Sequence, residues 1–283
     1  MHLLDHFSTF APRYDVVLCD IWGVVHNGIA AYAQACDALM RYRAGGGTVI
    51  LITNAPRPSP WVVRQLDQLG VPADAFDDVM TSGDLTREVV AGRNGGAVFH
   101  IGPQRDISIF DRLNVRFTPV EAADYVVCTG LFDDTTETPD HYRDLVAKIR
   151  GRNLFMLCAN PDLVVERGDK RVYCAGAIAD LYSTMGGEVL YAGKPHRPIY
   201  DGALLKAAAA RGVAASPART LAIGDSVRTD MRGARALGID GLFVSGGIHA
   251  AELGRESPSR DALAAIFAAA DVTPQSVTPR LVW

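Results

Sequence analysis

The stretch VVLCDIWGVVHNG, Val16 to Gly28, indicates both the fold class and a candidate site residue. Its first residues form a short, apolar and largely β-branched run, which predicts a buried strand. That strand ends on a carboxylate, Asp20, and the position two residues later holds Trp22. Ligands of open parallel sheets lie beyond the carboxyl ends of the strands, so Asp20 is a candidate site residue.

Runs of the same apolar kind recur along the chain and alternate with helical patterns. The further strand candidates are residues 48–53, 97–102, 125–130, 154–160, 189–193, 220–225 and 242–247. The helix candidates are residues 30–44, 60–69, 139–149, 198–210, 227–237 and 260–270. This repeated order of strand and helix predicts an α/β fold with parallel sheets and right-handed crossovers.

The composition is typical of a globular protein, and a small-molecule partner is expected. The chain has 283 residues, of which 48% are hydrophobic and 21% charged, so two packed units with ample core are expected. The sequence pI of 6.0 and the lack of any Lys/Arg run argue against a nucleic-acid or membrane-surface partner. The five cysteines are widely spaced without a CxxC pair, which predicts reduced core thiols.

The cell compartment is predicted from what the sequence does not contain. The first residues, MHLLDHFSTFAPRYD, lack the basic start and apolar stretch of a signal peptide. No segment approaches the roughly 20 apolar residues that span a bilayer. We therefore expect a cytoplasmic protein.

Polar residues follow several of the predicted strands. Asp20 ends the first strand, Thr53 and Asn54 end the second, Lys194 follows the run 189–193, and Asp225 ends the run 220–225. The carboxyl ends of parallel strands meet at one edge of a sheet, so these residues are expected to share that edge.

The strands between about residues 97 and 160 lack this pattern at their ends. We therefore expect them to belong to an inserted second unit. The predicted division is a core domain of residues 1–84 and 189–283 and an inserted domain of residues 85–188.

The residue types at the predicted edge suit phosphoryl transfer. A carboxylate such as Asp20 can attack phosphorus as a nucleophile and form a covalent intermediate. Asp20 and Asp225 together offer the hard oxygen ligands that Mg²⁺ prefers. Lys194 would balance the charge on the transferring group, while the Thr53 hydroxyl and the backbone N–H of Asn54 can donate hydrogen bonds to phosphate.

The motifs resemble those of the haloacid-dehalogenase-like (HAD) superfamily. The matching segments are DxxGV at Asp20 to Val24, TN at Thr53, GKP around Lys194 and GDSxxTD ending at Asp230. NPD at Asn160 to Asp162 and the stretch from Gly176 to the GKP motif are similar to the class IIA members, the NagD-like and nitrophenylphosphatase-like proteins. The resemblance covers almost the whole chain.

This resemblance implies a Rossmann-like parallel-sheet core with an inserted α/β cap domain. It also implies Mg²⁺-dependent phosphatase chemistry on a small phosphorylated metabolite. Caps of this family often mediate dimers, so a homodimer through the cap is an expectation. The cap residues Asn160 and Asp162 would face the substrate.

The family pattern also assigns roles to the site residues. It implies that Asp20 is the nucleophile that carries an aspartyl-phosphate and that Thr53 and Asn54 hold phosphate. Lys194 would steady the transferred group, and Asp225 would bind the metal together with Asp20. Asp230 would be a supporting acid.

Trp22 departs from the family pattern. Phosphatases of the family usually read DxD, with the second aspartate protonating the leaving oxygen and then activating water. General acid–base help of this kind contributes about 10²- to 10⁴-fold in rate. In the family the residue at this position also offers its backbone carbonyl to Mg²⁺, and Trp22 keeps that carbonyl.

Three interpretations of Trp22 follow. In the first interpretation the protein is a phosphatase that is limited to good leaving groups, or that borrows an acid such as His26 or a cap residue. Alternatively, it is a phosphate-ligand-binding or regulatory protein with weakened catalysis. In the third interpretation it is a haloacid dehalogenase, because those enzymes carry an aromatic residue at this position and attack carbon without a metal.

Overall fold

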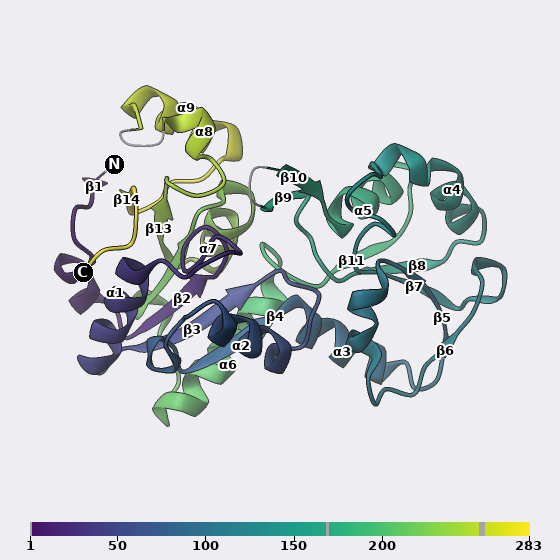
Figure 1. The fold of residues 1–283 in the computed structure, drawn as a ribbon, viewed down its shortest axis with the longest axis horizontal. Helices are drawn as coiled ribbons and strands as arrows, with labels where there is room; N and C mark the ends of the chain where they lie inside the picture. Colours follow the sequence, from purple (N-terminus) through teal and green to yellow (C-terminus); the bar gives the residue numbers. More distant parts are fainter. Residues whose placement is uncertain (1, 168–169, 255–257) are drawn as a thin grey trace. The chain divides into compact units, whose positions relative to one another are not determined.

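The computed structural model describes residues 2–167, 170–254 and 258–283, and the chain forms two compact units (Figure 1). The first unit comprises Met1–Thr53, Val62–Met80 and Lys194–Trp283, and the second comprises Asn54–Trp61 and Thr81–Gly193. The structure thus groups residues 54–61 and 189–193 with the second unit. The predicted domain limits, 1–84 with 189–283 and 85–188, stay a prediction.

The first unit is built on a seven-stranded sheet with the order β1-β14-β13-β12-β2-β3-β4. Every pair from β1 to β3 is parallel. The strands are β1 (His2–Leu3), β2 (Val16–Asp20), β3 (Thr48–Thr53), β4 (Asp78–Thr81), β12 (Thr220–Gly224), β13 (Asp240–Val244) and β14 (Ser276–Thr278). The helices are α1 (Ala33–Ala44), α2 (Ser59–Gln68), α6 (Arg197–Arg211), α7 (Arg232–Leu237), α8 (Ala250–Leu253) and α9 (Arg260–Ala270), of which α2 begins in the second unit.

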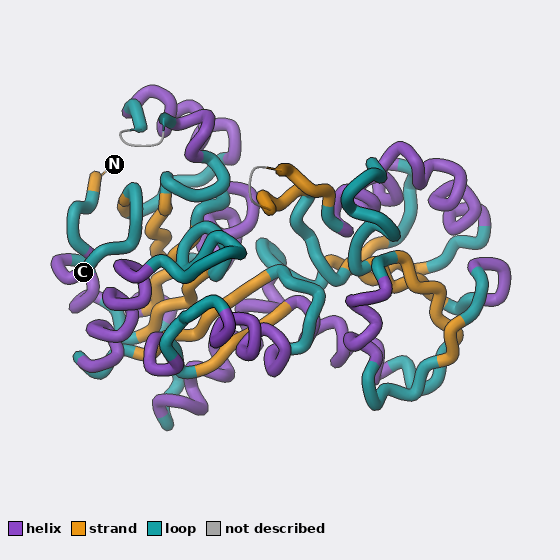
Figure 2. The backbone as a smooth tube through the Cα atoms, viewed as in Figure 1, coloured by secondary structure: helices purple, strands orange, loops and turns teal. Residues whose placement is uncertain are grey.

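The central strands of this sheet are buried along their whole length. All residues of β2, β3 and β12 are buried, as their continuous apolar sequences predict for a parallel sheet covered on both faces. Figure 2 shows the strands of this unit in orange with helices around them. The sheet therefore offers its strand ends, not its faces, for a site.

The second unit contains a five-stranded parallel sheet with the order β11-β8-β7-β5-β6. An antiparallel pair, β9 and β10, lies outside that sheet. The strands are β5 (Ala97–Ile101), β6 (Arg116–Phe117), β7 (Tyr125–Cys128), β8 (Phe155–Cys158), β9 (Val164–Arg167), β10 (Lys170–Tyr173) and β11 (Val189–Tyr191). The helices are α3 (Ser82–Gly92), α4 (Arg143–Gly151) and α5 (Ala175–Thr184).

Two apolar clusters cover the faces of the second sheet. Along β7, Val126 and Cys128 belong to one cluster, whereas Tyr125 and Val127 belong to the other. Successive side chains of a strand point to opposite faces, so this alternation shows that the sheet is buried on both sides. The second unit has a core of its own.

The predicted fold class, an α/β protein with a Rossmann-like parallel-sheet core and an inserted α/β unit, is confirmed. Each of the eight predicted strand runs overlaps a strand. One expectation was wrong: residues 189–193 were assigned to the core sheet, but β11 pairs with β8 in the second sheet. A short apolar strand does not reveal its partner strand, because pairing depends on the whole topology.

The cysteine prediction is also confirmed, since all five cysteines are free and buried. Among the helices that the structure describes, none is long and apolar enough to cross a membrane.

Candidate active site

The strand register brings three of the predicted residues to one edge of the first sheet. Asp20 is the register partner of Ile52, so Thr53 lies one step beyond it at the carboxyl end of β3. On the other side of β2, Cys19 is the partner of Ile223, and Asp225 directly follows the end of β12. The expected shared edge therefore exists for Asp20, Thr53 and Asp225.

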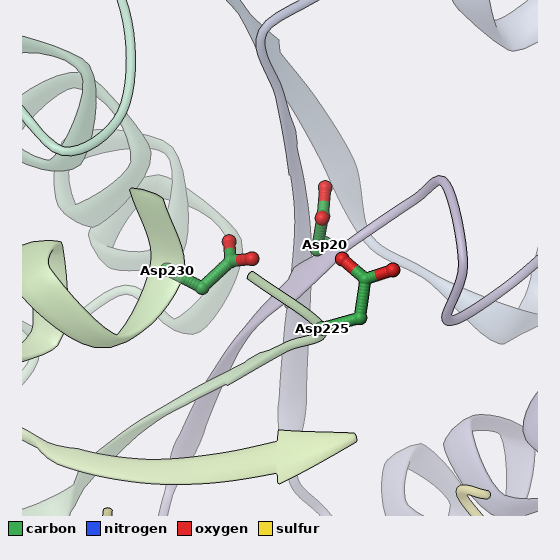
Figure 3. Close-up of side chains that lie close together, drawn as sticks. All are labelled: Asp20, Asp225 and Asp230. Carbon is green, nitrogen blue, oxygen red and sulfur yellow. The ribbon is translucent and has the colours of Figure 1, made fainter. Parts of the chain in front are cut away.

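Three carboxylates gather at this edge. Asp20, Asp225 and Asp230 are buried, and each offers an oxygen within 4.8 Å of the others (Figure 3). Asp230 comes from a wide helical turn at Val227–Met231, where its Oδ2 accepts a hydrogen bond from the backbone N–H of Ser226 at 3.1 Å. The turn thus brings Asp230 back toward the strand end that carries Asp225.

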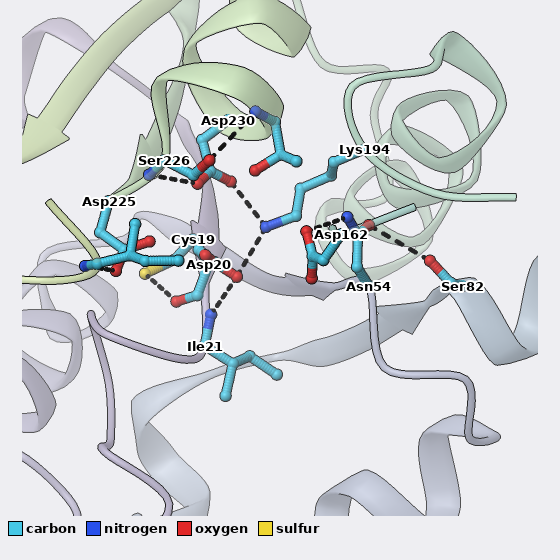
Figure 4. Close-up of polar contacts among 12 residues, drawn as sticks. Cys19, Asp20, Ile21, Asn54, Ser82, Asp162, Lys194, Asp225, Ser226 and Asp230 are labelled. Carbon is cyan, nitrogen blue, oxygen red and sulfur yellow. Dashed lines mark hydrogen bonds and ion pairs between the residues drawn. The ribbon is translucent and has the colours of Figure 1, made fainter. Parts of the chain in front are cut away.

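Lys194 joins this group as its cation. Its Nζ lies 2.7 Å from Oδ1 of Asp20 and 2.7 Å from Oδ1 of Asp230, and Figure 4 shows the ammonium between the two carboxylates. Only 2% of Lys194 is exposed. The ammonium is therefore held in place by two charge-assisted contacts.

The charges of this group do not balance. Burial and the negative charge of Asp230 raise the pKa of Asp20 well above its usual range, and Lys194 acts in the opposite direction. When all four groups are ionised, three carboxylates and one ammonium leave an excess of two negative charges. Uncompensated buried charge is costly, so the cluster favours a bound cation.

Backbone groups fix two of the carboxylates further. The N–H of Ile21 donates to Oδ1 of Asp20 at 2.7 Å, and the N–H of Ile248 donates to Oδ2 of Asp225 at 2.7 Å. Sequence analysis missed Ile21 and Ile248, because a backbone donor leaves no signal in residue type. The conformations of both acids are thus set by neighbouring main chain.

Asn54 follows Thr53 in the chain but belongs to the second unit. Its Nδ2 donates to Oδ1 of Asp162 at 2.9 Å, and its Oδ1 accepts from the hydroxyl of Ser82 at 3.3 Å. The NPD segment and the TN segment, which are far apart in sequence, therefore meet within this unit. Asp162 and Ser82 orient the Asn54 side chain.

Comparison with known proteins agrees with this arrangement. The family model described as haloacid dehalogenase-like hydrolase matches residues 17–116, and a HAD-hydrolase-like model matches residues 191–270. The crystal structure of a hydrolase of the haloacid dehalogenase-like family from Brucella suis 1330 is 46% identical. That likeness covers 99% of this chain and 100% of the other, with a TM-score of 0.89.

The chain belongs to the haloacid dehalogenase-like hydrolases. The predicted family resemblance and enzyme class, a hydrolase, are thereby confirmed.

Two further matches of this HAD-like hydrolase, one curated protein and one crystal structure, carry more specific names. The D-glycerol 3-phosphate phosphatase of Mycobacterium tuberculosis is 28% identical over 249 residues, which is 86% of this chain and 66% of that protein. A crystal structure of glycerol phosphate phosphatase from M. tuberculosis in complex with magnesium is 25% identical. It covers 87% of this chain and 72% of that chain, with a TM-score of 0.64.

In this HAD-like hydrolase, Trp22 belongs to a compact loop that follows β2. The backbone N–H of Gly23 donates to the carbonyl of His26 at 2.9 Å, and the N–H of His26 donates to the carbonyl of Ile21 at 3.2 Å. The indole lies edge-on to the His26 ring, with 5.0 Å between ring centroids. It also covers Gly28, where an added Cβ would lie 2.5 Å from Cη2 of Trp22. Trp22 therefore acts as a packing residue of this loop.

His26, one of the acids that the phosphatase interpretation could borrow, is enclosed by the loop. Only 1% of the residue is exposed, and its Nδ1 accepts a hydrogen bond from the N–H of Gly28 at 3.0 Å. Burial lowers the pKa of His26 to about 4. The ring is therefore neutral near pH 7 and is a poor proton donor there.

Gly23 allows the close approach of Asp225, which gives a testable prediction. Gly23 has a φ of +76°, and a Cβ there would lie 1.9 Å from Oδ2 of Asp225. Gly212 is a matched control, because it has a φ of +72° but nothing within 4 Å. Gly212→Ala should cost about 1 to 2 kcal/mol of stability from backbone strain alone.

Gly23→Ala should cost roughly a further 1 to 3 kcal/mol, because the Asp225 carboxylate must move. Urea unfolding of both variants measures the difference. Equal losses in the two variants would contradict the close approach of Asp225.

Proposed function

We propose that the protein is a Mg²⁺-dependent phosphatase that hydrolyses a small phosphorylated metabolite through an aspartyl-phosphate on Asp20. The observation that carries this proposal is the buried group of three carboxylates and one lysine at the strand ends of the first unit. The names of the M. tuberculosis relatives support the reaction class.

The first step would be attack by Asp20 on phosphorus. One carboxylate oxygen of Asp20 is fixed by the Ile21 N–H and Lys194, which leaves the other as the nucleophile. A carboxylate that is already oriented loses little freedom when it attacks. The Lys194 ammonium would then stabilise the charge that spreads over the transferring phosphoryl group.

Thr53 and Asn54 would hold the phosphate group. Thr53 ends the strand beside Asp20, and the side chain of Asn54 is oriented by Asp162 and Ser82. The hydroxyl of Thr53 and the backbone N–H of Asn54 are the expected donors. Asp230 supports the site by fixing Lys194, which it contacts at 2.7 Å.

The donor set fits a divalent cation. The ligands would be carboxylate oxygens of Asp20 and Asp225 and the backbone carbonyl of Trp22. Hard oxygen ligands of this kind suit Mg²⁺. The excess negative charge of the buried group points the same way. When bound, the cation would neutralise charge on the phosphate oxygens and allow the acids to remain ionised together.

Several other predictions accompany this proposal. These are the small phosphorylated partner, the absence of a nucleic-acid or membrane partner, a homodimer through the second unit, and a cytoplasmic location. The second unit would act as the cap that selects the substrate.

The test is phosphate release from a panel of phosphorylated metabolites with Mg²⁺ and with EDTA. We expect release that depends on Mg²⁺, because the carboxylate group needs a cation to stay ionised around a phosphate. The panel should include acetyl phosphate and 4-nitrophenyl phosphate, so that substrates of different reactivity are sampled.

The alternatives predict other results in the same assay. Tight binding of phosphate compounds without any release would support a phosphate-binding or regulatory protein. Halide release from a haloacid in EDTA would support a dehalogenase. Either result would contradict the proposed phosphatase.

A further inference from the structure

Trp22 stands where DxD phosphatases of the family carry the acidic residue, and its side chain packs within the loop. Trp22 covers Gly28 and contacts the His26 ring, so its half-buried indole packs within the loop. The indole N–H is a hydrogen-bond donor only and does not exchange a proton with a leaving group near pH 7. Trp22 therefore cannot protonate a departing oxygen.

His26 cannot protonate the leaving oxygen in its place unless the loop opens and exposes the imidazole. Its side chain has almost no exposed surface, and Gly28 occupies its Nδ1. A substrate atom needs an open face of the ring to receive a proton at hydrogen-bond distance. The geometry of the loop leaves His26 without such a face.

The acidic and basic side chains that the first unit places around Asp20 already have other roles. Asp230 accepts from Lys194 and from the Ser226 N–H, and Asp225 accepts from the Ile248 N–H. Lys194 carries protons, but it lies between two carboxylates at 2.7 Å from each. Both contacts occupy the ammonium, which therefore orients these carboxylates.

We propose that the substrate of this enzyme is a phosphate compound whose leaving group departs as a stable anion, as in an acyl phosphate or a phosphoanhydride. This inference rests on the proposed phosphatase function and specifies its substrate class. It differs from the alkyl phosphate in the names of the M. tuberculosis relatives. The class follows from Trp22, because an anion that is stable in water needs no proton when it leaves.

The chemical steps balance without a protein acid. An oxygen of the Asp20 carboxylate forms a bond to phosphorus, and the bond from phosphorus to the leaving oxygen breaks with its electron pair. The leaving group departs as a carboxylate or phosphate anion. Water then attacks phosphorus, the bond from phosphorus to Asp20 breaks, and the proton of the water passes to the released phosphate or to solvent.

Leaving groups differ widely in their need for a proton. The conjugate acid of a carboxylate leaving group has a pKa of about 4, as for a glutamate side chain, whereas a phenol has a pKa of about 10, as for tyrosine. An alkanol is a still weaker acid. A protein acid accelerates the reaction most when the conjugate acid of the leaving group is weak. Without a protein acid, rates should therefore fall steeply from acyl phosphates to alkyl phosphates.

The test compares kcat/KM for acetyl phosphate, 4-nitrophenyl phosphate, phenyl phosphate and glycerol 3-phosphate, with Mg²⁺ present. Wild-type enzyme should prefer them in that order, with acetyl phosphate at least about 10²-fold above glycerol 3-phosphate. Trp22→Asp and Trp22→Asn form a matched pair, because both remove the indole and only aspartate can transfer a proton. Trp22→Asp should exceed Trp22→Asn by about 10²- to 10⁴-fold on glycerol 3-phosphate. On acetyl phosphate the two variants should differ by less than tenfold.

The outcomes separate this inference from the function on which it rests. Wild-type rates for acetyl phosphate and glycerol 3-phosphate within tenfold of each other would overturn the substrate class and leave the phosphatase function standing. No phosphate release from any substrate would overturn both. If neither Trp22 variant folds, the wild-type order of rates still decides the question.

Discussion

Asp20→Asn should reduce phosphate release by about 10⁴-fold or more, which is the scale expected for loss of an attacking nucleophile. An amide does not attack phosphorus, so neither the covalent intermediate nor the turnover should form. The variant should nevertheless fold. Lys194 keeps its contact with Asp230 at 2.7 Å, and the substitution removes a buried carboxylate whose pKa burial raises.

Asp78→Asn is the matched control for this prediction. Asp78 begins β4 and pairs with Lys206 at 2.9 Å on a partly exposed part of the first unit. The Asp78→Asn substitution also removes one carboxylate charge from an ion pair with lysine, but it should leave turnover unchanged. Acid quenching during turnover, followed by peptide mapping, should place phosphate on Asp20 in the wild type and in Asp78→Asn. Phosphate on another residue, or full turnover by Asp20→Asn, would rule out the assignment.

The core sheet could be predicted from the sequence because its buried strands are continuous apolar runs. Continuous apolar runs such as residues 16–20 and 48–53 are typical of strands covered on both faces, and both are wholly buried. The site edge followed from the same strands, because parallel strands place their carboxyl ends together. Asp20, Thr53 and Asp225 were therefore predictable as neighbours.

Shorter elements were not predicted, for physical reasons. β4 has only four residues and begins on Asp78, after another aspartate, so its sequence reads as a polar loop. Helix α3 begins at a capping box in which Thr81 and Asp84 exchange hydrogen bonds, but its apolar positions are too few to mark it in the sequence. β11 has an apolar signature but no information on its partner, which is why it was placed in the wrong sheet.

The packing of the site was also beyond the sequence. Nothing in the residue types shows that Trp22 covers Gly28, or that Gly23 gives Asp225 its room. Such contacts depend on the path of the loop after β2, and that path is set by backbone hydrogen bonds. The sequence therefore shows that Trp22 replaces an acid, whereas the structure shows that Trp22 packs in the loop and that His26 is buried.

Lys194→Met should weaken both the fold and the activity. Removing one partner of a buried ion pair leaves its acids uncompensated, which typically costs about 3 to 5 kcal/mol. The activity should fall by about 10²- to 10³-fold, the usual effect of losing one group that stabilises the transition state. Lys206→Met is the control, because its partly exposed pair with Asp78 should be worth about 1 kcal/mol or less.

The pH dependence of the Lys194→Met effect follows from the pKa of Asp20. Lys194 lowers this pKa against burial and Asp230, so its removal should raise it further. A raised pKa means that the folded chain binds a proton that the unfolded chain, with an aspartate pKa of about 3.9, has already released. Folding is then favoured at low pH, and stability is lost as pH rises toward the folded-state pKa.

Urea unfolding between pH 4 and pH 8 without added metal should therefore show a steeper loss of stability in Lys194→Met than in the wild type. Added Mg²⁺ should restore part of that stability, because a cation among the carboxylates replaces some of the missing positive charge. Parallel curves for Lys194→Met and Lys206→Met would show that Lys194 does not control the ionisation of Asp20. In that case the lysine would have to act on the substrate alone.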